Sequence, residues 1–297
     1  MKGVVCMNIR DLEYFNHLCK TKSFTNAAKE LYVSQPSITL SLHRLEKELN
    51  SKLIIRDHSK KLFTLTEAGV VFEKRVKNIL YQMNEAKLEI AKIHNDKIKF
   101  GIPPIIGAYF FPLFIDDLVK YDFVKCIEFV ETGSLAMKNL LNSGKVYISF
   151  IGSLTPINDK NIDSTILKKD SFMLCVSENH PLSKNSVVDF KELKNEQFIV
   201  LGSSYIHSKV LNDLFKENNI IPKNIYHTEE IQTAKSLIAS GLGIGIMINM
   251  AVKKMPGIKT IPLKEPVPFY ISLALKKDHY MTKKEKEIRD LIISKKI

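Results

Sequence analysis

Residues 23–46, SFTNAAKELYVSQPSITLSLHRLE, constrain the fold most, because they predict two short helices joined by a tight turn. Thr25 is the predicted N-cap of the first helix, whose paired alanines let another helix approach closely. Ser34 is the predicted N-cap of the second helix, and Pro36 stands in its first turn, where a missing N–H costs nothing. The pair is either an ordinary helical hairpin or a motif that places its second helix in a DNA groove.

The second helix has two different faces. Its apolar residues recur at intervals of three or four, so we expect them to be buried: Ile38, Leu42, Leu45 and Leu49. The residues expected to face outward are Ser37, Thr39, Leu40, Ser41, His43 and Arg44. Short polar side chains near a helix N-terminus suit entry into a major groove.

Charge and composition narrow the class of protein. The formal net charge is +12, which favours an anionic partner, either nucleic acid or an anionic membrane surface. Residues 1–98 hold 17 Lys and Arg against 11 Asp and Glu, so half of the net charge lies in the first third. The cysteines at 6, 19, 126 and 175 share no metal or disulfide spacing, and no segment is apolar enough to span a membrane. We therefore expect a cytoplasmic protein without membrane attachment.

A wing and a long helix are predicted after the helix pair. Residues 52–56 and 62–65 predict two short strands around a basic loop, whose lysines would reach DNA phosphates or a minor groove. The alternative is a hairpin tip that is only exposed to solvent. The helix after Thr66 has apolar residues at heptad spacing: Phe72, Val76, Ile79, Met83, Ala86, Ile90 and Ile93. This seam predicts a dimerisation helix, and the alternative is packing against its own domain. A dimer would present two recognition helices to DNA.

The first third resembles the winged helix-turn-helix of LysR-type transcriptional regulators. The resemblance rests on Ala27-Ala28, Ser34-Gln35-Pro36-Ser37, Leu45-Glu46, Leu49, Leu53, Arg56 and Leu65-Thr66-Glu67-Ala68-Gly69. It implies a bacterial transcription factor that binds double-stranded DNA, forms a dimer or tetramer and contacts RNA polymerase. It also implies a domain for a small-molecule effector after the linker helix. We accordingly expect no enzymatic activity, no cofactor and no metal.

The recognition helix departs from the pattern of that family. Thr39 replaces the usual serine, and Leu40 and Ser41 stand where Arg and Gln are common. Asn50 replaces a glycine and tolerates the same left-handed backbone. The residues predicted to contact DNA are Thr25, Ser34, Gln35, Pro36, Ser37, Thr39, Ser41, His43, Arg44, Arg56, Lys60 and Lys61.

The remaining two thirds alternate strands with helices, which predicts an α/β fold with parallel strands. Predicted strands are 99–102, 125–130, 146–151, 172–176, 198–201, 226–228, 243–248 and 270–275; predicted helices are 106–121, 134–141, 206–217, 231–240 and 283–293. The resemblance implies two subdomains like those of periplasmic binding proteins. The expected domains are a winged helix-turn-helix at 7–64, a linker helix at 65–95, regulatory subdomain I at 96–163 with 268–297, and regulatory subdomain II at 164–267.

An effector site is expected where strands end and helices begin in this region. Three such junctions carry hydroxyls or free N–H groups that suit a carboxylate or another small anion, and ordinary helix capping is the alternative at each. The predicted effector-binding residues are Pro103, Pro104, Ile105, Thr132, Gly133, Ser134, Ile151, Gly152, Gly202, Ser203, Ser204 and Thr228. Two other functions remain open, a thiol-based redox sensor using Cys126 and Cys175, and a small-anion enzyme fused to a winged helix.

Overall fold

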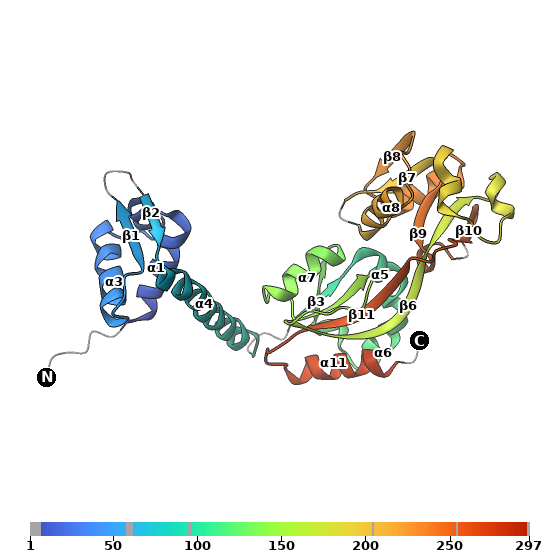
Figure 1. Ribbon diagram of the computed structural model, residues 1–297. Coiled ribbons are helices and arrows are strands. Elements are labelled where there is room, and N and C mark those ends of the chain that lie inside the picture. The colour runs from blue at the N-terminus through green and yellow to red at the C-terminus, as the bar shows by residue number, and fades with distance from the viewer. Residues whose placement is uncertain (1–6, 58–61, 94–96, 204, 254, 296–297) are drawn as a thin grey trace. The chain divides into compact units, whose positions relative to one another are not determined.

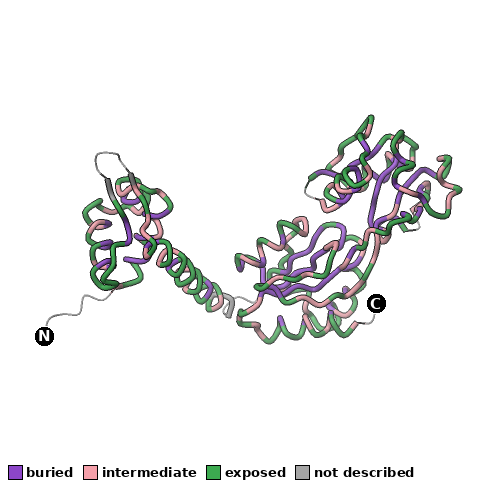
Figure 2. The backbone as a smooth tube through the Cα atoms, in the orientation of Figure 1, coloured by how far each residue is buried: buried purple, intermediate pink, exposed green. Residues whose placement is uncertain are grey.

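The chain folds into two compact units. The computed structural model describes residues 7–57, 62–93, 97–203, 205–253 and 255–295. The units are Met1–Ala91 and Lys92–Ile297. Figure 1 shows that the first is helical with a hairpin and the second is built around a sheet. In Figure 2 the sheet strands are largely buried, whereas most of the long helix is exposed.

The first unit is a winged helix-turn-helix. Its elements are α1 (Ile9–Thr21), α2 (Phe24–Glu30), α3 (Gln35–Glu48), β1 (Ile54–Asp57), β2 (Leu62–Leu65) and α4 (Glu67–Ile93). The two strands pair antiparallel, with Ile54 opposite Leu65. The helix pair, the wing strands and the long helix predicted from the sequence are therefore confirmed (Figure 1).

Side-chain caps decide where the paired helices begin. Ser34 caps α3 and Pro36 lies in its first turn, as predicted. The cap of α2 is Ser23, whose side chain accepts a hydrogen bond from the N–H of Asn26. The predicted cap at Thr25 is wrong because this residue already lies inside the helix, which begins at Phe24.

One hydrophobic core lies between these helices and the wing. Ile38, Leu42 and Leu45 of α3 are buried as predicted. Leu49 is instead 36% exposed, because α3 ends at Glu48 and the chain then turns away. Asn50 makes that turn with φ +46°, the left-handed conformation expected for it. The other core residues include Leu12, Phe15, Leu18, Ala27, Ala28, Leu53 and Val76.

The second unit contains a mixed sheet. Its strands are β3 (Ile98–Ile102), β4 (Ile127–Glu131), β5 (Ile148–Ser153), β6 (Ile162–Ser177), β7 (Gln197–Leu201), β8 (Asn224–Thr228), β9 (Gly245–Ile248), β10 (Ile258–Pro262) and β11 (Pro268–Lys276). The main sheet runs in the order β10-β6-β11-β5-β3-β4, with β9 also paired to β6, and β7 and β8 form a separate pair.

Helices and short 3-10 turns surround the strands. The helices are α5 (Pro104–Tyr109), α6 (Ile115–Lys120), α7 (Ser134–Asn142), α8 (Ile206–Glu217), α9 (Ile231–Ala239), α10 (Asn249–Val252) and α11 (Lys283–Ser294). The turns are η1 (Phe111–Phe114), η2 (Val124–Cys126), η3 (Pro181–Lys184) and η4 (Phe190–Asn195). The single helix predicted over 106–121 is broken into α5, η1 and α6, because Pro112 lacks the N–H that a continuous helix needs.

The prediction of parallel strands throughout is wrong. β3 is parallel to β4 and β5, and β7 to β8, but β6, β9, β10 and β11 join the sheet through antiparallel pairs. The spacing of apolar residues identifies a strand but carries no information on its direction. We refer to β3, β4, β5, α5, α6, α7 and α11 as subdomain I, and to β7–β10 and α8–α10 as subdomain II.

The long strand β6 runs from one subdomain into the other. The first part of β6 pairs with β11 of the main sheet, and residues 172–177 pair with β9 and β10 of subdomain II. The sequence predicts only the second part of β6, because Lys168, Lys169 and Asp170 interrupt the apolar pattern before it. A register shift between Ile271 and Ser272 of β11 marks an irregularity in this paired segment.

Candidate DNA-binding face and effector cleft

The outward face of α3 combines small polar groups with one large apolar side chain. The predicted contact residues that are exposed or half-buried there are Ser34, Gln35, Pro36, Ser37, Thr39 and His43. Leu40 is 59% exposed on the same helix. The Ser34 hydroxyl oxygen accepts a hydrogen bond from the Ser37 N–H, which keeps the first turn of the helix ordered. Thr25 is exposed on α2.

Ser41 does not face outward as predicted. Its side chain is 1% exposed. Residue 41 follows Ile38 by three positions and precedes Leu45 by four, so helical periodicity places it on the buried face. Ser41 is therefore unsuited to contact DNA.

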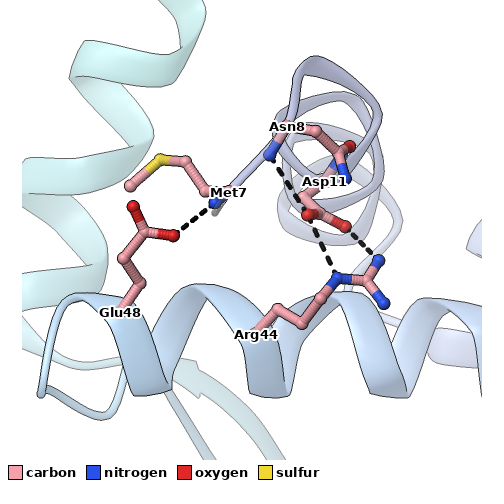
Figure 3. A network of polar contacts seen from close by, with 5 residues as sticks. All are labelled: Met7, Asn8, Asp11, Arg44 and Glu48. Carbon is pink, nitrogen blue, oxygen red and sulfur yellow. Dashed lines mark hydrogen bonds and ion pairs between the residues drawn. The ribbon is translucent and has the colours of Figure 1, made fainter. Parts of the chain in front are cut away.

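Arg44 is bound within the first unit. Figure 3 shows its guanidinium against the carboxylate of Asp11 on α1, with Nε 3.2 Å from Oδ2 and a second contact from Nη2 to Oδ1. The Asp11 side chain is fully buried. Burial raises the pKa of this carboxyl, but hydrogen bonds from Arg44 and the Asn8 N–H outweigh it and hold the pKa below 3.8. We assign Arg44 to positioning α3 on α1, and its predicted contact with DNA stays a prediction.

A second contact in Figure 3 joins the same two elements. The backbone N–H of Met7, just before α1, donates to the carboxylate of Glu48 in the last turn of α3. The start of α1 is thus fixed to α3 at two points along the recognition helix.

Glu46 links α3 to the wing. One carboxylate oxygen accepts from the N–H groups of Leu53 at 2.9 Å and Ile54 at 3.4 Å, and the other contacts the Lys52 ammonium at 2.8 Å. Burial raises the pKa of Glu46, but the Lys52 and backbone hydrogen bonds outweigh it and hold the pKa below 4.5. The Glu46 carboxylate therefore holds the start of β1 against α3.

A tight contact closes the wing against α4. The Thr66 hydroxyl donates to the carbonyl of Lys52 at 2.6 Å and accepts from the N–H of Gly69 at 2.9 Å. A Cβ on Gly69 would lie 2.1 Å from the carbonyl oxygen of Leu53, so a larger residue cannot occupy this position without backbone movement. These contacts explain physically why threonine and glycine stand at this spacing.

The predicted wing contacts are described only in part. Arg56 pairs through its backbone with Phe63 across the hairpin. Lys60 and Lys61 lie outside the described residues. All three stay predictions as DNA contacts.

The first heptad of α4 packs within its own unit. Val76 is fully buried in the core, and the Phe72 ring lies 5.2 Å from the ring of Phe15. Their predicted place in a dimer seam is wrong, because α1 already covers this face of the helix. The alternative interpretation, packing against the same domain, holds for these two residues.

The later part of the seam is different. Ile79 is 44% exposed and Ile90 is 60% exposed, Ala86 is exposed, and Met83 is half-buried. Two large apolar side chains on one helix, without cover from the described part of their own unit, are suited to a second copy of the helix.

A small cavity lies between the two subdomains. It encloses about 30 Å³, room for about one water molecule. Its walls are formed by Pro103, Pro104, Ile105, Ile106, Gly133, Ser134, Tyr205, Ile206, His207, Ile248 and Phe269. The first turns of α7 and α8, one from each subdomain, both open onto this space.

Five predicted effector residues line the cavity: Pro103, Pro104, Ile105, Gly133 and Ser134. The Ser134 hydroxyl oxygen accepts from the N–H of Gly152 at 2.9 Å, which ties the start of α7 to β5. Gly152 therefore supports the wall without lining it.

Ile151 points away from the cavity. It is 3% exposed in a separate cluster with Met137 and Ala274, because neighbouring residues in a strand face opposite sides of a sheet. Its prediction as a wall residue is wrong. Thr132 and Ser203 are also absent from the cavity walls, and Ser204 lies outside the described residues.

The junction at Gly202 is unsuited to an anion. The carboxylate of Glu229 lies so close that a Cβ on Gly202 would be 2.0 Å from its oxygen. The Thr228 hydroxyl oxygen accepts from the N–H of Glu230 in a local turn. The carboxylate of Glu229 at this point would repel another anion in the arrangement seen here, and the roles of Gly202 and Thr228 as effector contacts stay predictions.

Sequence reasoning missed Ile106, Tyr205, Ile206, His207, Ile248 and Phe269. Apolar wall residues look the same in sequence as core residues, so no local signal separates them. His207 is the exception, since a histidine in the first turn of an otherwise apolar helix face is a polar group in need of a partner.

A contact across the subdomains lies at the other end of α5. The Tyr109 hydroxyl accepts from Gln232 Nε2 at 3.1 Å and from the Lys235 ammonium, which also lies 4.3 Å from the centre of the tyrosine ring. Lys235 is 3% exposed. These groups connect α5 to α9 and hold the subdomains together.

The other functions considered receive little support. Burial raises the pKa of the Cys175 thiol to about 12, which makes it a poor nucleophile, and Cys126 is partly exposed on a different subdomain.

Among the described residues, no cluster of His, Cys, Asp and Glu could hold a metal ion. No helix in that part of the chain is both long and apolar enough to cross a membrane.

Comparison with known proteins identifies the family. The LysR substrate binding domain matches residues 93–295, and the bacterial regulatory helix-turn-helix protein of the lysR family matches residues 9–70. The malolactic fermentation system transcriptional activator of Lactococcus lactis is 30% identical over 289 residues, which cover 96% of this chain and 98% of that protein.

Solved structures share the fold. Full-length BenM superposes with a TM-score of 0.55 at 23% identity, covering 96% of this chain and 95% of BenM. The effector binding domain of QuiR in complex with shikimate gives a TM-score of 0.56 at 24% identity, covering 67% of this chain and 96% of that domain. With its winged helix-turn-helix and its substrate binding domain, the chain belongs to the LysR family of transcription regulators.

Proposed function

We propose that this protein binds specific DNA sequences as a dimer and is controlled by a small anionic effector in the cleft between subdomains I and II. The proposal of an anionic effector rests on one observation: the N-termini of α7 and α8 lie at the same cavity. First-turn N–H groups lack partners within the helix and carry partial positive charge, so together they favour a carboxylate.

The proposed DNA contact is the exposed face of α3 in a major groove, with the wing beside it. Gln35 and His43 are its longer polar side chains, and Ser37 lies on the first turn. Ile79 and Ile90 of α4 would meet their counterparts in a second copy, which gives a two-fold arrangement and a (pseudo)palindromic site.

Effector binding requires the cleft to open. A cavity of about 30 Å³ is too small for a carboxylic acid of several carbon atoms. The effector would therefore favour a more open arrangement of the subdomains over the closed one, in proportion to its difference in affinity for the two. DNA affinity changes if the two arrangements bind DNA differently.

The DNA assignment is tested with duplexes selected from a random library on the wild-type protein. Ser37→Glu places a negative charge against the phosphates and should weaken binding at least tenfold in fluorescence anisotropy. Gln82→Glu adds the same charge to an exposed position of α4 and serves as the control. Equal affinity of the Ser37→Glu and wild-type proteins would overturn the recognition-helix assignment.

The effector assignment is tested by thermal shift with a panel of small carboxylates. L-malate and L-lactate enter the panel because of the malolactic relative, and shikimate because of the QuiR complex. The expected result is stabilisation by at least one member, lost when Ile206→Trp fills the cleft. Stabilisation that survives Ile206→Trp would place the ligand elsewhere and contradict the proposal.

A further inference from the structure

His207 is a buried polar side chain with no partner. It lies in the first turn of α8, is 3% exposed, and lines the cavity between the subdomains. Neither ring nitrogen makes a hydrogen bond to any described residue. Its nearest ring neighbours are Phe172, with centres 5.1 Å apart, and Tyr205, at 6.3 Å.

This arrangement is costly in the absence of a ligand. Leaving a buried polar group without a hydrogen-bond partner lowers the stability of the folded protein, and most buried polar side chains do have a partner. Burial lowers the pKa of His207 to about 3, so in the closed arrangement the ring is neutral and offers one N–H donor and one acceptor nitrogen. A leucine or phenylalanine would fill the same apolar space without that cost, so packing alone does not explain histidine here.

We infer that His207 is the polar anchor of the effector and that the effector is a hydroxycarboxylic acid, whose hydroxyl meets the imidazole while its carboxylate meets the helix N-termini. This inference rests on the proposed function and adds a recognition residue and a ligand class to it. A hydroxyl group both donates and accepts, so it pairs with a neutral imidazole in either tautomer. The remaining walls, formed mostly by Pro, Ile and Phe side chains, suit the carbon skeleton of such a ligand.

The inference predicts discrimination between acids that differ only in the hydroxyl. A site that pairs a buried polar group with a hydroxyl rejects the analogue that lacks it, because the group is then left unpaired. The matched pairs are L-malate with succinate and L-lactate with propionate. In isothermal titration calorimetry at pH 7, the wild-type protein should bind the hydroxylated member of at least one pair about tenfold more tightly.

Two substitutions assign the discrimination to His207. His207→Leu removes both nitrogens at similar volume and should abolish the preference within the pair. His207→Gln keeps a donor and an acceptor and should restore part of it. The melting temperature of ligand-free His207→Leu should equal or exceed that of the wild type, because an unpaired buried polar group has been removed.

The outcomes separate this inference from the proposed function. If His207→Leu keeps the full preference for the hydroxylated acid while Ile206→Trp abolishes binding, the cleft is the effector site and the role of His207 is refuted. If ligand binding survives Ile206→Trp, the proposed cleft itself is refuted. If the hydroxylated acid binds the wild type more tightly in neither pair, or if neither pair binds, the inferred ligand class is wrong.

Discussion

A few charged residues set the geometry of the DNA-binding unit through contacts within that unit. Asp11 and Arg44 hold α1 against α3, and Glu46 holds the wing to α3. In sequence these residues look like surface charges on amphipathic helices, so Arg44 was expected to face outward. Only the packing of α1 shows that a fully buried carboxylate needs the guanidinium.

Arg44→Met should destabilise the first unit by about 1–2 kcal/mol, because Asp11 would lose its charged partner inside the protein. The guanidinium side chain is 37% exposed, and solvent screening keeps the effect at this modest size. Urea unfolding measures the change. Arg10→Met, an exposed arginine on α1, is the matched control and should change stability little. Equal stability of the two variants would contradict the positioning role of Arg44.

Acid should weaken the same unit. Asp11 and Glu46 both have a pKa below the ordinary values of 3.8 and 4.5. A lowered folded-state pKa means that the unfolded chain binds protons first as the pH falls, so the stabilisation is complete above about pH 5 and is lost progressively below pH 4.5. Thermal melting between pH 3 and pH 6 should show this loss, and Glu46→Gln should flatten the pH profile. A profile unchanged in that variant would mean that Glu46 contributes nothing to acid sensitivity.

Among the elements, α4 shows what a periodic pattern can and cannot reveal. The heptad spacing predicts which residues share a face, and the structure confirms one continuous helix there. The pattern does not identify the partner of that face, so Phe72 and Val76 were expected in a dimer although they pack on α1 and the helix pair. The same limit applies to strands, whose apolar spacing did not reveal the antiparallel direction of β6 and β11.

The two parts of α4 should respond differently to mutation. Ile79→Lys combined with Ile90→Lys should give monomers in sedimentation with little loss of folding stability, because both side chains are exposed in the single chain. Val76→Ala should instead lower stability by roughly 2 kcal/mol and leave the dimer intact, because it removes buried methyl groups from the core. A persistent dimer of the double lysine variant would show that another surface carries self-association.

In the second unit, the order of residues along the chain does not show which residues lie close together in the folded structure. The cavity walls come from five segments, and only the junctions before α5 and α7 were recognised from their Pro, Gly and Ser residues. Tyr205, Ile248 and Phe269 were missed because their neighbours across the cleft are distant in sequence. The charge of Glu229 at Gly202 likewise depends on a tertiary contact that no local motif contains.

Tyr109→Phe should loosen the closed arrangement of the subdomains. It removes the hydroxyl that accepts hydrogen bonds from Gln232 and Lys235, and it leaves the buried ammonium without that acceptor. Hydrogen exchange of α9 amides should become faster, by about five- to tenfold. Tyr121→Phe, at an exposed tyrosine of the same subdomain, is the control and should leave exchange unchanged. Identical exchange in both variants would show that this contact does not hold the cleft closed.

The paired strands β6 and β11 have a mechanical consequence for regulation. Where the chain passes between the subdomains, β6 pairs with the returning segment: the Phe172 N–H donates to the Val267 carbonyl at 2.9 Å, and Ser171 lies opposite Pro268. The register shift between Ile271 and Ser272 lies within the main sheet, where β11 also pairs with β5, so bending between the subdomains should concentrate at residues 171–172 and 267–268 instead. Because the two crossings are adjacent and paired, subdomain II should rotate mainly about one axis relative to subdomain I. Ligands of different shape should then produce the same kind of movement and differ only in its extent.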